Sequence, residues 1–169
     1  MGIPISTFAI SLVIDGKPVL GVVYDPFTDR MYWAIEGAGA FINSKEIHVS
    51  TARTLDKNYV VLSGRMGDSN ITTGEYYDKL MLLGGKPFSL RTYIYGLMMV
   101  ARGDAVGSVA GYFKPWDIAA PLLILNEAGA MVTDYDGNPA SVYSVDNGLI
   151  ASNGNVHNEL LKLLRKSSS

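Results

Sequence analysis

One carboxylate stands out in this sequence, because it directly follows a tryptophan and precedes a long apolar run. Asp117 lies in the segment KPWDIAA, ahead of PLLILNEAGA, where a helix is expected to start. A carboxylate at a helix start accepts hydrogen bonds from free backbone N–H groups and meets the positive end of the helix dipole. The same arrangement suits a divalent cation and a phosphate bound together. Asp117 is therefore either a helix cap or one ligand of a metal site, and one carboxylate alone does not make a Mg²⁺ site.

Other familiar catalytic patterns are missing from the sequence. It contains no P-loop, no G-x-S-x-G elbow and no H-E-x-x-H zinc motif. His48 and His157 stand alone, and a lone histidine is more often a surface or capping group than a ligand. Asp134 and Asp136 flank a tyrosine ahead of a Gly-Asn pair, which is typical of a turn. Cysteine is absent, which excludes disulfides, thiolate metal sites and a cysteine nucleophile.

The composition argues against two classes of partner. Of the 169 residues, 48% are hydrophobic and 18% are charged, which is enough apolar material for a buried core. The formal net charge is -2 and Lys and Arg form no basic run, so nucleic acid is not expected as a partner. The start lacks the basic region of a signal peptide, and Asp15 interrupts the first apolar run before it reaches membrane-spanning length. We expect a cytoplasmic protein that binds neither nucleic acid nor a membrane.

The elements that must position Asp117 fall into two parts of the chain. In residues 1–50, β-rich runs at 6–14 and 17–24 flank Asp15-Gly16, a dipeptide typical of a tight hairpin, and further strands follow to residue 50. These runs predict an antiparallel β meander. Residues 51–169 instead predict alternating helices and strands. The expected helices are 72–83, 92–102, 117–128 and 155–165, and the expected strands lie in 130–137 and 148–153. For residues 92–102, the spacing of apolar residues alone does not exclude a strand. The expected fold is one domain over residues 1–169, of the mixed, layered α/β class.

Asp117 also belongs to a longer pattern. The segment KPWDIAAPLLILNEAGAMVTDYDG resembles the C-terminal signature of the inositol monophosphatase family, the Mg²⁺-dependent phosphatases of sugar and polyol phosphates. Three further segments resemble that family in order: GIPISTFAISLVIDGKPVLGVVYDP, EGAGAFINSKEIHVS and NGLIASNGNVHNELLKLL. The resemblance covers most of the chain. It implies the C-terminal part of the family's fold and a family activity of phosphomonoester hydrolysis.

By this resemblance, Asp117 is a metal ligand of a divided site. The earlier family motifs that supply the other metal-binding acids, a Glu-Glu-type pair and Asp-Pro-Ile/Leu-Asp-Gly-Thr, have no counterpart in the chain. The resemblance therefore implies a truncated member with weak or no Mg²⁺ binding and negligible activity unaided. Its missing ligands are expected from an N-terminal segment. The alternative is a non-catalytic module that binds a partner or an anion, or that covers its exposed apolar surface by forming a homo-oligomer.

The resemblance also suggests substrate contacts. An ungapped count back from the segment VARG places the family's Gly-Ser/Thr loop on Arg91 and Thr92, so the hydroxyl is kept and a cation replaces the glycine. Lys114 is a further candidate contact for an anion. The acid that contacts inositol in the animal enzymes falls on Ala110, so inositol selectivity does not carry over. The expected ligand is a small phosphorylated sugar or polyol held by Arg91, Thr92 and Lys114.

Overall fold

The first part of the chain folds into a five-stranded antiparallel sheet. The structure is a computed structural model that describes residues 4–64, 71–144 and 148–165. Strands pair in chain order: β1 (Phe8–Ile14), β2 (Lys17–Asp25), β3 (Arg30–Ile35), β4 (Ala40–Ile42) and β5 (Lys45–Ile47). Asp15 and Gly16 join the first two strands with φ angles of 49° and 79°, as a tight hairpin turn requires. The predicted meander is confirmed.

The second part of the chain alternates helices with short strands. Its helices are α1 (Thr73–Leu82), α2 (Tyr93–Ala101), α3 (Pro115–Glu127) and α4 (His157–Leu163). Its strands are β6 (Tyr59–Ser63), β7 (Lys86–Phe88), β8 (Gly107–Ala110), β9 (Met131–Thr133) and β10 (Leu149–Ser152). The predicted helices are confirmed to within about two residues at each end, and residues 92–102 hold a helix rather than a strand. Strands β6, β7 and β8 were not predicted.

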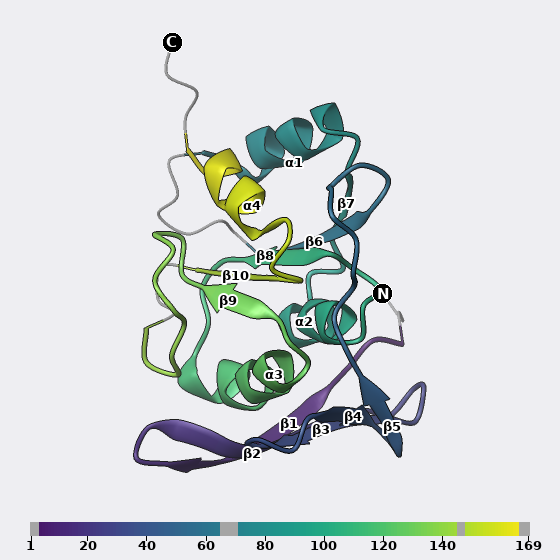
Figure 1. Cartoon of the computed structure of the whole chain (residues 1–169), viewed down its shortest axis with the longest axis vertical. Helices are drawn as coiled ribbons and strands as arrows, with labels where there is room; N and C mark the ends of the chain where they lie inside the picture. Colours follow the sequence, from purple (N-terminus) through teal and green to yellow (C-terminus); the bar gives the residue numbers. More distant parts are fainter. Residues whose placement is uncertain (1–3, 65–70, 145–147, 166–169) are drawn as a thin grey trace.

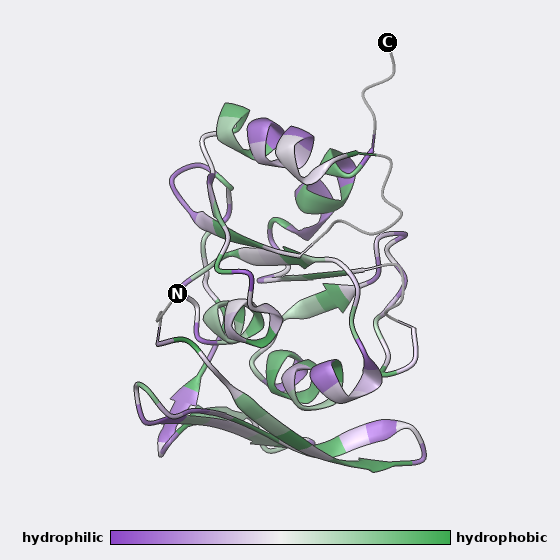
Figure 2. Cartoon of the chain, turned by 180° about the vertical axis from the view of Figure 1, so that it is seen from behind, coloured by the Kyte–Doolittle hydropathy of each residue, from purple (hydrophilic) through white to green (hydrophobic). Residues whose placement is uncertain are grey.

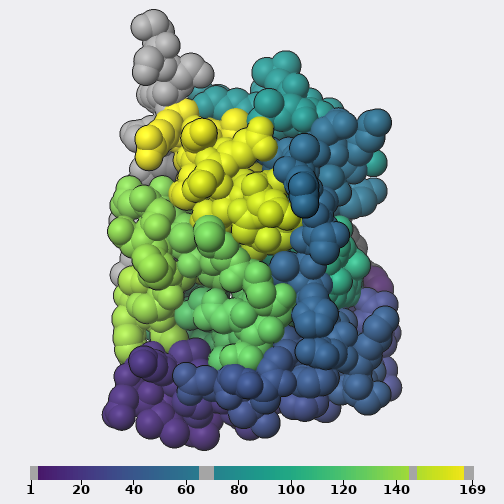
Figure 3. Space-filling view, viewed as in Figure 1, coloured from purple at the N-terminus to yellow at the C-terminus, as the bar shows by residue number. Residues whose placement is uncertain are grey.

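These strands form a second, mixed sheet in the order β7-β6-β8-β10-β9. Strand β6 pairs parallel with β7 and β8, whereas β10 pairs antiparallel with β8 and β9. Helices α2 and α3 lie between the two sheets, and α1 and α4 cover the far face of the second sheet (Figure 1). The first sheet forms one end of the molecule (Figure 3).

Close packing joins the first sheet to the helices behind it. At Gly21 of β2 a Cβ atom would lie 2.9 Å from the carbonyl oxygen of Ala120 in α3, so only glycine allows this approach. One cluster of buried side chains draws on both parts of the chain: it includes Val23 from the first sheet, Leu97 of α2 and Ile124 of α3. In the described part of the chain, no helix has the length and apolar run needed to cross a membrane.

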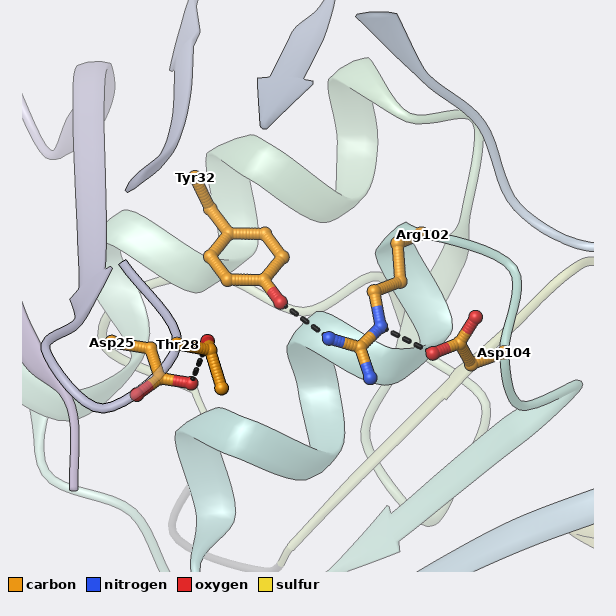
Figure 4. A network of polar contacts seen from close by, with 5 residues as sticks. All are labelled: Asp25, Thr28, Tyr32, Arg102 and Asp104. Atoms are coloured by element: carbon orange, nitrogen blue, oxygen red, sulfur yellow. Dashed lines mark hydrogen bonds and ion pairs between the residues drawn. The ribbon is translucent and has the colours of Figure 1, made fainter. Parts of the chain in front are cut away.

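A polar network also ties the first sheet to the end of α2 (Figure 4). The Arg102 guanidinium donates to the hydroxyl of Tyr32, which is 1% exposed, at 2.6 Å and to the Asp104 carboxylate at 2.5 Å. Burial disfavours the charge, but Tyr32 and Asp104 outweigh it and raise the pKa of Arg102. Nearby, the buried carboxylate of Asp25 accepts a hydrogen bond from the Thr28 hydroxyl at 2.6 Å and closes the turn after β2. The Arg102–Tyr32 hydrogen bond joins β3 to the C-terminal end of α2.

Candidate active site

The starts of helices α2 and α3 meet at a pocket of about 230 Å³. Three residues singled out from the sequence line it: Arg91, Thr92 and Asp117. The other lining residues are Thr7, Tyr93 and Ile94. The pocket thus combines a cation, two threonine hydroxyl groups and a carboxylate with the first turn of a helix.

Asp117 is the third residue of α3 rather than its N-cap. The helix begins at Pro115, whose missing N–H suits the first helical position, and its N-cap residue is Lys114. The Asp117 carboxylate accepts a hydrogen bond from the Lys114 N–H at 3.3 Å, and the Asp117 N–H donates to the Lys114 carbonyl at 2.9 Å. The helix therefore begins two residues before Asp117, within the agreement found for the other predicted helices. The carboxylate nevertheless helps to cap the helix, as the acidic residue of a capping box does.

Arg91 has an unusual backbone conformation for its residue type. Its φ angle is 53°, in the left-handed region that favours glycine, and its N–H donates to the Ser89 hydroxyl at 3.3 Å. The ungapped comparison places the family's glycine at this position, so the conformation supports that alignment. The exposed Arg91 side chain lines the same pocket as Asp117.

Thr92 is the N-cap residue of α2. Its φ and ψ angles are -130° and 117°, and its side chain makes no capping hydrogen bond within the described residues. The first-turn N–H groups of an α-helix have no partner inside the helix, so they can donate to an anion. The residues of that first turn, Tyr93 and Ile94, line the pocket beside Thr92. The start of α2 therefore offers donors to the pocket.

Lys114 is not among the residues that line the pocket. Its ammonium group donates to the Tyr112 hydroxyl and lies 4.7 Å from the centre of the Tyr112 ring. The structure therefore brings together Arg91, Thr92 and Asp117 but directs the Lys114 side chain to Tyr112. The role of Lys114 as an anion contact stays a prediction.

Sequence analysis missed Thr7, Tyr93 and Ile94. Tyr93 packs against Phe113, with ring centres 5.0 Å apart, and passes so close to Gly64 that a Cβ there would collide with its ring. Tyr93 and Ile94 directly follow Thr92 at a helix start, so their position in the chain could have indicated that they line the pocket. Nothing in the sequence pointed to Thr7, which precedes β1.

The pocket does not by itself fit a metal ion. Among residues 4–64, 71–144 and 148–165, no three His, Cys, Asp or Glu side chains lie together where they could hold one. Asp117 supplies a carboxylate to the pocket, and Thr7 and Thr92 supply hydroxyl groups. Mg²⁺ prefers octahedral coordination by oxygen atoms and is usually bound through carboxylates together with substrate phosphates. The described residues do not complete such a set.

The fold and the pocket together define a layered α/β protein with polar groups gathered at two helix starts. The chain belongs to the inositol monophosphatase family, whose profile matches residues 1–169. It is 32% identical over 165 residues to the fructose-1,6-bisphosphatase/inositol-1-monophosphatase of Thermotoga maritima, a match that covers 98% of this chain and 62% of the relative. It is also 32% identical over 175 residues to the inositol-1-monophosphatase of Synechocystis, covering 95% of this chain and 56% of the relative.

Solved structures show the same fold. The IMPase of Thermotoga maritima matches with a TM-score of 0.85 at 32% identity, over 94% of this chain and 60% of that one. The extragenic suppressor protein suhB of Bartonella henselae matches with a TM-score of 0.87 at 29% identity, over 98% of this chain and 66% of that one. The predicted layered α/β class is confirmed. The chain spans about 60% of the length of these relatives.

Proposed function

We propose that this chain is the C-terminal portion of a metal-dependent phosphatase that hydrolyses small sugar or polyol phosphate monoesters. One observation carries the proposal: Arg91, Thr92 and Asp117, which the family resemblance singles out, line one pocket where α2 and α3 begin. The names of the relatives support the substrate class, because they include an inositol-1-monophosphatase and a fructose-1,6-bisphosphatase.

The start of α2 is the phosphate-binding part of this proposed site. The first-turn N–H groups, which have no partner within the helix itself, and the helix dipole favour an anion there. The Thr92 hydroxyl donates a further hydrogen bond, and the Arg91 guanidinium contributes a cation whose planar donors suit phosphate oxygens. These groups orient the phosphoryl group and stabilise its charge. They contain no nucleophile and no base for attack on phosphorus.

Asp117 makes the site incomplete without a metal cation. A carboxylate and a phosphate dianion in one pocket of about 230 Å³ repel each other, and the exposed Arg91 guanidinium offsets this only in part, so a metal cation between them favours tight phosphate binding. The resemblance implies that this cation is Mg²⁺. The described residues do not complete a Mg²⁺ site. We therefore propose that the other ligands come from an N-terminal segment, since the relatives are longer than this chain. The chain alone then binds Mg²⁺ weakly or not at all and has negligible activity.

An alternative function is a non-catalytic module of the same family that binds an anion or associates with itself. The apolar outer face of the first sheet favours this alternative, because seven of its large side chains are exposed.

In either case we propose a single domain over residues 1–169, since one buried cluster joins residues 1–50 to residues 51–169. A cytoplasmic location is proposed from the absence of cysteine.

Phosphate titration without metal, followed by NMR, tests the proposed site. Asp117→Asn should tighten phosphate binding about fivefold, because removing a like charge from a partly solvated pocket is worth roughly 1 kcal/mol. Arg91→Gly should weaken binding by a similar factor, while its φ of 53° suits glycine and preserves the loop. Lys57→Gly is the matched control, since Lys57 is an exposed lysine with a φ of 62° outside the pocket.

Two results would count against the proposed site. If Asp117→Asn left phosphate affinity unchanged or weakened it, the carboxylate would not face the anion. If Arg91→Gly and Lys57→Gly had equal effects, Arg91 would act only through the overall charge of the protein.

A further inference from the structure

The start of α2 packs against the end of strand β6. Ser63, the last residue of β6, is 2% exposed, and its hydroxyl donates to the Thr92 carbonyl at 3.3 Å. The same carbonyl accepts the first hydrogen bond of the helix, from the Gly96 N–H at 3.4 Å. Both distances exceed the usual range for such bonds, so these two bonds alone hold the helix start only loosely.

Tyr93, the first residue of α2, makes a much closer contact with this strand end. Gly64 follows β6 with a φ of 75°. A Cβ atom on Gly64 would collide with the Tyr93 hydroxyl oxygen and would lie 2.7 Å from Cε1 and from Cζ of the ring. Any side chain at residue 64 would therefore displace the ring. Glycine at this position leaves the space that the Tyr93 ring occupies.

The Tyr93 ring also packs against the segment that leads into α3. Its centre lies 5.0 Å from the centre of the Phe113 ring at an interplanar angle of 57°, within the favourable range for aromatic pairs. Phe113 is 1% exposed and directly precedes Lys114, the N-cap residue of α3. Both views of the chain show α2 and α3 side by side between the two sheets (Figure 1 and Figure 2). One side chain therefore contacts both the end of β6 and the segment before α3.

These contacts lie between groups that line the pocket. Arg91 and Thr92 directly precede Tyr93, and Asp117 follows Phe113 by four residues. Groups that bind one ligand together must be held to within about half an ångström of their working geometry. A side chain that packs against both segments can set the distance between the donors of α2 and the carboxylate of α3.

We propose that Tyr93 is a positioning residue of the phosphate pocket, which holds the start of α2 at a fixed place relative to Asp117. It does so through the contacts of its ring with Gly64 and Phe113. The inference rests on the proposed function, because it concerns the groups that would bind the phosphoryl group. The ring, rather than the hydroxyl, performs this role.

Titration with inorganic phosphate, followed by NMR, tests the role of the ring. Tyr93→Leu removes the ring and should weaken phosphate binding about fivefold, which corresponds to the loss of one favourable aromatic pair. Tyr93→Phe keeps the ring and should restore most of the affinity lost in Tyr93→Leu. If the hydroxyl instead bound phosphate directly, the two variants would lose affinity equally.

Gly64→Ala tests the same contact from outside the pocket, because Gly64 is not among the lining residues. The added Cβ should displace the Tyr93 ring and weaken phosphate binding about as much as Tyr93→Leu does. Gly37→Ala is the matched control. Gly37 has a φ of 74° and no atom within 4 Å of an added Cβ, so alanine there meets the same backbone strain without the collision. Far-UV circular dichroism checks that each variant folds.

A measurement without phosphate separates this inference from the proposed function. In the free protein, Gly64→Ala should shift the amide resonances of Ile94 and Asp117, and Gly37→Ala should not. Resonances that do not move would overturn the inference. So would equal phosphate affinities in Gly64→Ala and Gly37→Ala, or equal losses in Tyr93→Leu and Tyr93→Phe. If the resonances moved but the unaltered chain bound no phosphate, the proposed function would fail and the positioning of the two helix starts would stand.

Discussion

Glu127 should stabilise the fold by clamping a loop that lies far from it in the sequence. Its two carboxylate oxygens accept hydrogen bonds from the N–H groups of Gly37 and Gly39, each at 2.8 Å. Both glycines have positive φ, 74° and 85°, which turns their N–H groups toward the end of α3. Each bond involves a charged acceptor on a half-buried side chain, so its net contribution is about 1 kcal/mol. Glu127→Ala should therefore lower the free energy of unfolding by about 2 kcal/mol.

Urea unfolding at pH 7, followed by circular dichroism, measures this loss. Glu127→Gln keeps one acceptor oxygen and should lose about half as much. Asn126→Ala, at the exposed neighbouring position, is the control and should change stability by less than about 0.5 kcal/mol. If Glu127→Ala matched this control, the two hydrogen bonds would contribute nothing net and the reasoning would be refuted.

Two further predictions concern a buried histidine and a tight helix contact. Burial of His157 between two hydroxyl groups lowers its pKa below 6.5, so the unfolded chain takes up a proton that the folded chain does not. The free energy of unfolding, measured by urea titration, should therefore decrease as the pH is lowered from 7.5 to 5.5, with a slope of up to about 1.4 kcal/mol per pH unit. An equal decrease in His157→Asn would contradict this explanation. In α2, Gly96→Ala would place a Cβ atom 2.8 Å from Cγ1 of the buried Val61 and should cost about 1–2 kcal/mol in thermal unfolding. Gly74→Ala in α1, where the nearest atom is 3.9 Å away, should be neutral or stabilising; equal effects of the two substitutions would refute the packing argument.

The elements that sequence analysis predicted are those whose signals are local. The Asp15-Gly16 turn and its flanking β-rich runs predict the hairpin, and the Thr72 capping box with Glu75 marks the start of α1. Strand β8 has no such signal, because all four of its residues are buried and no alternation of polar and apolar residues remains. Strand β6 is also short, and both its partners are parallel strands far along the chain. A short buried run of this kind is assigned only by its tertiary contacts.

The residues of the candidate site also divide into those that the sequence predicts and those that depend on tertiary structure. Asp117 was singled out because its surrounding segment is long and distinctive, and an ungapped count back from the segment VARG placed Arg91 and Thr92. The left-handed backbone of Arg91 could not be inferred from its residue type, because arginine rarely adopts it. Thr7 reaches the pocket only through the packing of the first sheet. The side chain of Lys114 turns to Tyr112, a choice of rotamer that sequence does not determine.

We propose that this chain contributes a phosphate-facing pocket and a single carboxylate to a phosphatase site that other residues must complete. Phosphate release from inositol 1-phosphate and fructose 1,6-bisphosphate, measured with the purified 169-residue chain and added Mg²⁺, tests it most directly. We expect no release above the rate in buffer. Mg²⁺-dependent release that Asp117→Ala abolishes would contradict it.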